Sequence, residues 1–174
     1  MTGKRFINAV ANGETDVIEI LLGLLQETGS PYCVIGGLAV NAFAEPVVSL
    51  DLDLVVVSDR VGDLTRAAAD KGMKMQEFEH SINLSIGGSD LRIQIQTDAR
   101  YQPFVSRAER KNVLGYEMFV ACLEDVVQGK VWAYSDETRR RSKRQKDLSD
   151  IMRLVETHPF LREELPAEIR SQIE

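Results

Sequence analysis

The chain has 174 residues, of which 44% are hydrophobic and 28% charged, and its formal net charge is −6. These values predict one globular domain, or one domain with a helical extension, with enough residues to bury a sizeable core. No apolar run approaches the roughly 20 residues of a membrane span, and no secretory signal is apparent. The acidic balance argues against a chain built as a whole to bind nucleic acid. We expect a cytoplasmic protein with Cys33 and Cys122 as free thiols.

The first part of the chain alternates helical and strand patterns. Apolar spacing and turn residues predict helices over Glu14–Thr28, Leu38–Ala44 and Asp59–Lys71, and strands over Tyr32–Ile35 and Leu50–Val57.

The second part begins with strands and ends with helices. We predict strands over Met73–Phe78, Ile82–Ile86 and Leu91–Gln96, with a hairpin turn between the last two, and a short edge strand over Met118–Ala121. Helices are predicted over Leu123–Tyr134 and Arg144–Val155. This order indicates an α+β fold with a mixed sheet packed against helices. Residues 1–121 would form the core with an N-terminal helix, and residues 122–174 a helical segment that packs on it as one compact unit.

Two short motifs suggest chemistry. The strand that ends at Ile35 is followed by Gly36-Gly37, where a backbone without side chains lets a phosphate approach closely. The next strand carries Asp51 and Asp53, which point to the same face because side chains alternate along a strand. Aligned carboxylates suit a hard divalent cation such as Mg²⁺. The alternative is a tight turn followed by two solvent-facing aspartates.

The strand over Leu91–Gln96 places Arg92, Gln94 and Gln96 on one side, which we expect to be the side of Asp51 and Asp53. Gln94 cannot usefully accept a proton. Asp90 and Asp98 lie at the ends of this strand and are weaker candidates for a further carboxylate.

Three later features are also notable. Residues 139–146 hold six basic side chains in eight residues, which favours either a solvated helix face or an anion site for triphosphate or RNA. Lys130 lies in an apolar helix stripe, so it must snorkel or find an anion such as a phosphate. Asp147 and Asp150 lie one turn apart and are candidates either for the site or for helix-start electrostatics. His80 and His158 are isolated and are interpreted as structural.

The Gly-Gly pair and the Asp-x-Asp motif, over Tyr32–Val57, resemble the nucleotidyltransferase superfamily with the polymerase-β-like fold. The resemblance implies a nucleotidyltransferase-like mixed sheet with a short C-terminal helical part. It also implies phosphate binding at Gly36 and Gly37 and a metal, Mg²⁺ or Mn²⁺, at Asp51 and Asp53. Many members carry a third carboxylate on a later strand, where this chain has Gln94.

The segment with Lys130 and the Lys-Asp-x-x-Asp helix around Asp147 looks like the second half of AbiEii/AbiGii-type nucleotidyltransferases, which include bacterial toxins. In this resemblance Lys130 contacts the triphosphate, Asp147 completes the acidic site, and Ser49 matches a hydroxyl before Asp-x-Asp. Val47 stands where the family often has arginine, and the family's larger C-terminal domain is barely present.

The resemblance implies an enzyme that uses Mg²⁺ to transfer NMP from an NTP to a hydroxyl of an acceptor. The acceptor could be a tRNA, a protein or a small molecule, and an antitoxin chain is a conceivable partner. The alternative is a non-catalytic nucleotide-binding or regulatory module with a degenerate site, which the Gln94 position favours.

Overall fold

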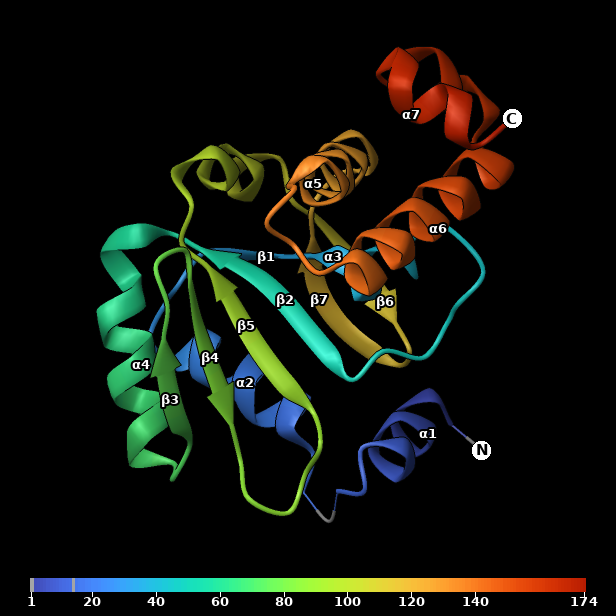
Figure 1. Ribbon diagram of the computed structural model, residues 1–174. Helices are drawn as coiled ribbons and strands as arrows, with labels where there is room; N and C mark the ends of the chain where they lie inside the picture. Colours follow the sequence, from blue (N-terminus) through green and yellow to red (C-terminus); the bar gives the residue numbers. More distant parts are fainter. Residues whose placement is uncertain (1, 14) are drawn as a thin grey trace.

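The computed structural model describes residues 2–13 and 15–174, and within them seven strands form one mixed sheet in the order β3-β4-β5-β2-β1-β7-β6 (Figure 1). The strands are β1 (Tyr32–Ile35), β2 (Asp51–Val56), β3 (Lys74–Glu77), β4 (Ser81–Ser85), β5 (Arg92–Gln96), β6 (Glu109–Val113) and β7 (Tyr116–Val120). At the centre, β2 pairs antiparallel with β1 and parallel with β5. The sheet confirms the α+β class.

Helices cover both faces of this sheet. The α-helices are α1 (Gly3–Val10), α2 (Val17–Glu27), α3 (Gly36–Val40), α4 (Val61–Asp70), α5 (Leu123–Ser135), α6 (Arg141–Thr157) and α7 (Ala167–Gln172), and the 3₁₀ helices are η1 (Ser58–Arg60), η2 (Ala99–Arg107) and η3 (Pro159–Glu164). Figure 1 shows α2 and α4 together behind the sheet and α5 beside α6 over its other end. No helix among the described residues combines the length and apolar character needed to cross a membrane.

The register of the central strands explains how the sheet divides apolar from polar side chains. Leu52 and Leu54 on β2 pair with Ile93 and Ile95 on β5, and all four side chains are buried. Side chains alternate along a strand, so the intervening polar residues of both strands project to the opposite face. That face is the one on which α5 and α6 lie.

Several helices differ from the sequence predictions at their ends. Helix α1 was not predicted, because it is only eight residues long and buries a single side chain, that of Ile7. Helix α2 starts at Val17 with Asp16 as its N-cap rather than at residue 14, which lies outside the described residues. Helix α3 starts two residues early, at Gly36, and its α-helical part ends at Val40 rather than Ala44.

The prediction of a short edge strand near Met118 was wrong in its position. Strand β7 lies inside the sheet, because it pairs parallel with β1 and antiparallel with β6. The edge strand on this side is β6, which the prediction missed. Its charged and polar residues Glu109–Asn112 hide the apolar alternation that usually reveals a strand.

Helix α6 starts three residues earlier than predicted, at Arg141, with Arg140 as its N-cap. Asp147 and Asp150 therefore lie in its second and third turns, and the first turn contains no acidic residue. Their interpretation as helix-start residues was wrong. Both side chains are buried, so other contacts must account for them.

Candidate active site

Strand β2 holds two half-buried carboxylates on the face toward α5 and α6. The carboxylate of Asp51 is bound by two cations from different elements. Its Oδ1 accepts a hydrogen bond from Arg92 Nε at 2.9 Å, and its Oδ2 lies 3.3 Å from Lys143 Nζ. The first contact follows from the β2–β5 register, in which Asp51 is opposite Arg92. Asp51 is thus held between β5 and α6.

The carboxylate of Asp53 makes no hydrogen bond or ion pair with any residue in the described ranges. Burial raises the pKa of this carboxyl, while the nearby Lys130 acts in the opposite direction. In the sheet, Asp53 is paired with Ile35, which is the residue that precedes Gly36. A Cβ at Gly36 would press against Asp53 Oδ2, and Gly36 has a φ of 71°. Both facts require glycine at this position.

Gly37 is different, because a Cβ there would meet only ordinary contacts. The closest atoms would be Lys146 Nζ at 3.6 Å, and Asp150 Oδ2 and Ser49 Oγ at 3.8 Å. A tight turn therefore explains Gly36 but not Gly37. The space beside Gly37 is bordered by the ammonium of Lys146 and the hydroxyl of Ser49, both of which can bind a phosphate, and by the carboxylate of Asp150, which is paired with Lys130.

Ser49 has a structural role as well. Its buried Oγ accepts a hydrogen bond from the N–H of Asp51 at 3.2 Å and so shapes the start of β2. This contact places the hydroxyl between the Asp-x-Asp strand and Gly37.

Lys130 on α5 lies inside an ion-pair network rather than at the surface. Its Nζ is 2.9 Å from Asp147 Oδ1 and 2.8 Å from Asp150 Oδ2 on α6, and only 7% of its side chain is exposed. Arg139 Nε binds Asp147 Oδ2, and Arg153 Nη1 binds Asp150 Oδ1, each at 2.8 Å. Burial lowers the pKa of Lys130, but the two carboxylates outweigh it and leave the pKa above its usual value.

A small pocket brings these groups together. Asp53 and Gly36 line it with Lys130 and Asp147. Lys130 thus lines the same pocket as Asp53, but its ammonium pairs with the α6 carboxylates and not with Asp51. Asp147 and Lys130 are therefore joined to each other beside the pocket.

The same pocket is lined by Gln94, Gln96 and Tyr101. Gln94 lies opposite Asp53 in the β2–β5 register, as its strand position predicted. Burial raises the pKa of Tyr101 to about 12, so its phenol stays protonated at neutral pH. Asp98 lies at the end of β5 and binds Arg100 instead. Of the described residues that line the pocket on the β5 side, none has a side chain suited to accept a proton.

The basic run 139–146 contains both exposed residues and residues that face the candidate site. Arg140 and Arg141 are exposed at the start of α6. Arg139 and Lys143 turn toward the site, where they pair with Asp147 and Asp51, and Lys146 Nζ lies near Gly37. The sequence placed Arg92 on the side of Asp51 and Asp53, and Lys143 and Lys146 in the basic run, but it did not predict which groups they contact. Only the strand register and the packing of α6 over β2 identify them.

The residues of this site fit a divalent metal ion. Asp51 and Asp53 present hard oxygen donors on one face, and the carboxylate of Asp53 is unpaired in the described part of the chain. No group of three or more acidic, histidine or cysteine ligands occurs among the described residues. Mg²⁺ commonly takes one or two carboxylates together with substrate phosphates, so two are sufficient.

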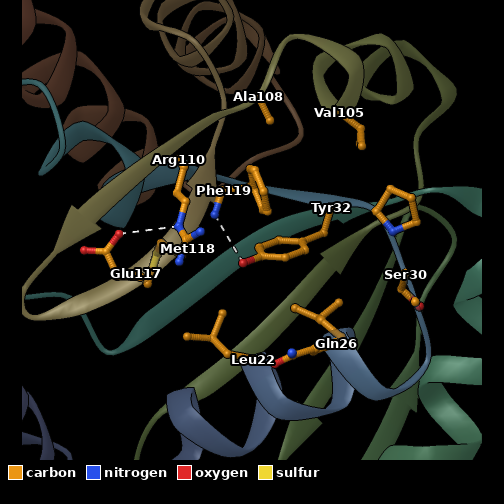
Figure 2. Close-up of a pocket in the computed structure, with 13 residues that line it drawn as sticks. Leu22, Gln26, Ser30, Tyr32, Val105, Ala108, Arg110, Glu117, Met118 and Phe119 are labelled. Atoms are coloured by element: carbon orange, nitrogen blue, oxygen red, sulfur yellow. Dashed lines mark hydrogen bonds and ion pairs between the residues drawn. The ribbon is translucent and has the colours of Figure 1, made fainter.

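A larger cavity of about 550 Å³ lies elsewhere, at the β1–β7 junction on the side of α2. Figure 2 shows Leu22 and Gln26 of α2 on one side of it, and Tyr32 with Phe119 on the other. The Tyr32 hydroxyl accepts a hydrogen bond from the N–H of Phe119 at 3.2 Å. None of the candidate site residues lines this cavity, so its size does not make it the active site.

Searches with protein-family models and among curated proteins find no match to this chain. Solved structures do match. ANT(2″)-Ia in complex with adenylyl-2″-tobramycin is 19% identical, with a TM-score of 0.65 over 91% of this chain and 97% of that one. The lincomycin-bound lincosamide adenylyltransferase LnuA is 11% identical, with a TM-score of 0.57 over 82% and 99%.

An antigenic nucleotidyltransferase-like protein from Paracoccidioides brasiliensis is 16% identical, with a TM-score of 0.53 over 86% of this chain and 75% of that one. All three identities are low, so the matches establish the architecture. The mixed sheet and its helices therefore have a nucleotidyltransferase-like fold.

Proposed function

We propose that this protein is a nucleotidyltransferase that moves an NMP group from an NTP to an acceptor oxygen. The observation that supports this most is the unpaired carboxylate of Asp53, which lies against the space that a Gly36 side chain would fill. A half-buried carboxylate without a partner among the described residues is costly. Its position beside a glycine turn and a second carboxylate suits a site for metal-bound triphosphate.

The proposed reaction is a displacement at the α-phosphorus. The acceptor oxygen forms a new bond to this phosphorus, and the bond to the oxygen that bridges to the β-phosphate breaks, so that pyrophosphate leaves. Asp51 and Asp53 would hold Mg²⁺ or Mn²⁺, which would neutralise charge on the transferred group. Gly37, Ser49 and Lys146 would bind the leaving phosphates. Catalysis of this kind depends mainly on positioning and electrostatics.

Lys130 and Asp147 take a supporting role in this proposal. Because the ammonium of Lys130 already contacts two carboxylates at 2.9 Å or less, it would fix α5 against α6 beside the triphosphate. We propose that the AbiEii/AbiGii-type resemblance reflects this shared framework. A toxin role would show as growth arrest on expression that Asp53→Asn relieves, and an adjacent antitoxin gene would support it.

The test is incubation of the purified chain with each α-labelled NTP, Mg²⁺ and either total RNA or cell extract. We expect label to pass from one or more NTPs to an acceptor and to disappear with Asp51→Asn/Asp53→Asn. Asp59→Asn, an exposed aspartate outside the site, is the matched control. Metal removal with EDTA should have the same effect as the double substitution.

The second candidate is a non-catalytic nucleotide-binding module. Gln94 in place of a carboxylate and the pairing of Asp51 with Arg92 and Lys143 favour it. Metal-dependent NTP binding without any transfer of label, in every acceptor mixture, would identify this alternative and contradict the first.

A further inference from the structure

The face of β3, β4 and β5 next to Asp51 and Asp53 is polar and carries no acid. The registers place these side chains on one side of the sheet: Lys74, Gln76, Ser81, Asn83, Ser85, Arg92, Gln94 and Gln96. In Figure 1, α5 and α6 lie toward the opposite end of the sheet from these strands. The ammonium of Lys74, the guanidinium of Arg92 and the amides of Gln94 and Gln96 are hydrogen-bond donors. This face can therefore receive a ligand that accepts hydrogen bonds.

The order of the strands indicates that the acceptor substrate approaches over this face. β1, with Gly36 and Gly37 after it, lies on one side of β2, and β5 lies on the other. In phosphoryl transfer the attacking and leaving oxygens are roughly in line. If pyrophosphate leaves on the Gly37 side, near Lys146, the acceptor must approach from the β5 side.

This approach side offers a cation but no base. Gln94 faces Asp53, and the phenol of Tyr101 stays protonated at neutral pH. Arg92, whose side chain is 64% exposed, donates only its Nε to Asp51. Its two terminal nitrogens make no hydrogen bond within the described residues, and they form the fork that binds phosphate oxygens in pairs.

An ionised phosphate group suits an approach side that has a cation and no base. A phosphomonoester already carries negative charge at neutral pH, so it can attack without giving up a proton. Arg92 and Lys143 would reduce the repulsion between this anion and the α-phosphate.

We propose, on the basis of the nucleotidyl transfer inferred above, that the attacking group of the acceptor is a phosphomonoester and that Arg92 selects it. This replaces the hydroxyl expected from the sequence. A phosphate oxygen of the acceptor bonds to the α-phosphorus, the α–β bridging bond breaks, and pyrophosphate leaves. No proton is transferred. The product is a phosphoanhydride between the NMP and the acceptor phosphate.

The test uses a protein-free cell extract in two halves, one dephosphorylated with a phosphatase that is then removed. Each half is incubated with the full chain, α-labelled NTP and Mg²⁺. We expect labelled product only in the untreated half, and we expect a nucleotide pyrophosphatase to cleave it. Ribonuclease treatment of the product distinguishes a 5′-phosphorylated RNA from a small phosphomonoester.

Label that transfers equally in both halves would overturn the phosphate acceptor and leave the proposed function intact. Absence of label in both halves, and in the RNA and protein mixtures above, would contradict the proposed function and this inference together.

Substitution of Arg92 tests its role in selection. Arg92→Gln should raise the KM for the phosphorylated acceptor about tenfold or more, since a charged hydrogen bond contributes about 1.5–3 kcal/mol, and should leave the KM for NTP nearly unchanged. Arg92→Lys should recover part of the loss. Arg66→Gln, an exposed arginine on α4, is the control. Equal changes in both KM values would show that Arg92 only positions Asp51.

Discussion

The two adjacent glycines are required for different physical reasons. Gly36 has a φ of 71° and no room for a Cβ beside Asp53. A Cβ on Gly37 would instead point into the space between Ser49 and Lys146, where we place the phosphates.

The first prediction compares the two positions. Gly36→Ala should lower the free energy of unfolding by at least about 1–2 kcal/mol, the cost of a left-handed conformation for alanine, with the clash in addition. Gly37→Ala should leave it within about 0.5 kcal/mol but weaken NTP binding. Chemical denaturation and nucleotide titration measure the two effects. Unchanged nucleotide affinity in Gly37→Ala would contradict the phosphate assignment.

The second prediction concerns the pH dependence of stability. Burial raises the pKa of Asp53 in the folded state, so the folded protein binds this proton more tightly than the unfolded chain. Below the pKa of Asp53 in the unfolded chain, about 3.9, this difference costs no stability. The cost grows as the pH rises from that value and is complete once the pH has passed the pKa of Asp53 in the folded protein. Without metal, Asp53→Asn should therefore gain stability relative to the parent chain at pH 7 but not at low pH.

Urea denaturation at several pH values, in EDTA, measures this difference. Added Mg²⁺ should stabilise the parent chain but not Asp53→Asn. A variant that is less stable than the parent at pH 7 without metal would show that Asp53 has a stabilising partner.

At the scale of elements, helices α5 and α6 are joined through charge as well as apolar packing. The ammonium of Lys130 on α5 forms ion pairs with the carboxylates of Asp147 and Asp150 on α6. All three side chains are less than a tenth exposed. Removal of one member of such a network leaves buried charge uncompensated.

The third prediction is that Lys130→Met lowers the free energy of unfolding by about 3–5 kcal/mol, because the carboxylates of Asp147 and Asp150 lose the cation between them. Methionine fills a similar volume, so the loss reports the missing charge and not a cavity. The exposed Lys71→Met is the control. Combination of Lys130→Met with Asp147→Asn and Asp150→Asn should recover part of the loss. A loss below about 1 kcal/mol would mean that the network is solvated.

At the scale of the whole molecule, we propose that residues 1–121 and the helical segment 122–174 form one cooperative unit. The functional groups come from both parts, because Asp51 belongs to β2 and its partner Lys143 to α6. Trp132, the only tryptophan of the chain, lies on α5 and stacks on Phe104 of η2 at a centroid distance of 5.7 Å.

The fourth prediction is that Trp132 fluorescence and far-ultraviolet circular dichroism give coincident unfolding curves in urea. The fluorescence reports the junction of the two parts and the dichroism reports the whole chain, so a single transition requires that they unfold together. A fluorescence change that precedes the loss of secondary structure would show that the segment 122–174 unfolds separately.

Much of the fold could be predicted from local patterns. Strand β1 was predicted residue for residue, and β2, β5 and α5 to within one residue at each end, because alternation and helical spacing are properties of neighbouring residues. Strand β6 and the start of α6 were missed. Their residues are mostly charged, and they are held by pairing or packing with distant segments.

The sequence by itself determined that Asp51 and Asp53 share a face and that a glycine pair precedes them, since both depend on spacing of a few residues. Only the tertiary structure decided which groups surround them. It pairs Arg92 and Lys143 with Asp51, leaves Asp53 without a partner among residues 2–13 and 15–174, and encloses Lys130 between Asp147 and Asp150. These contacts depend on strand order and on how α6 crosses the sheet. Both result from the burial of apolar surface by the whole chain, and no local pattern records them.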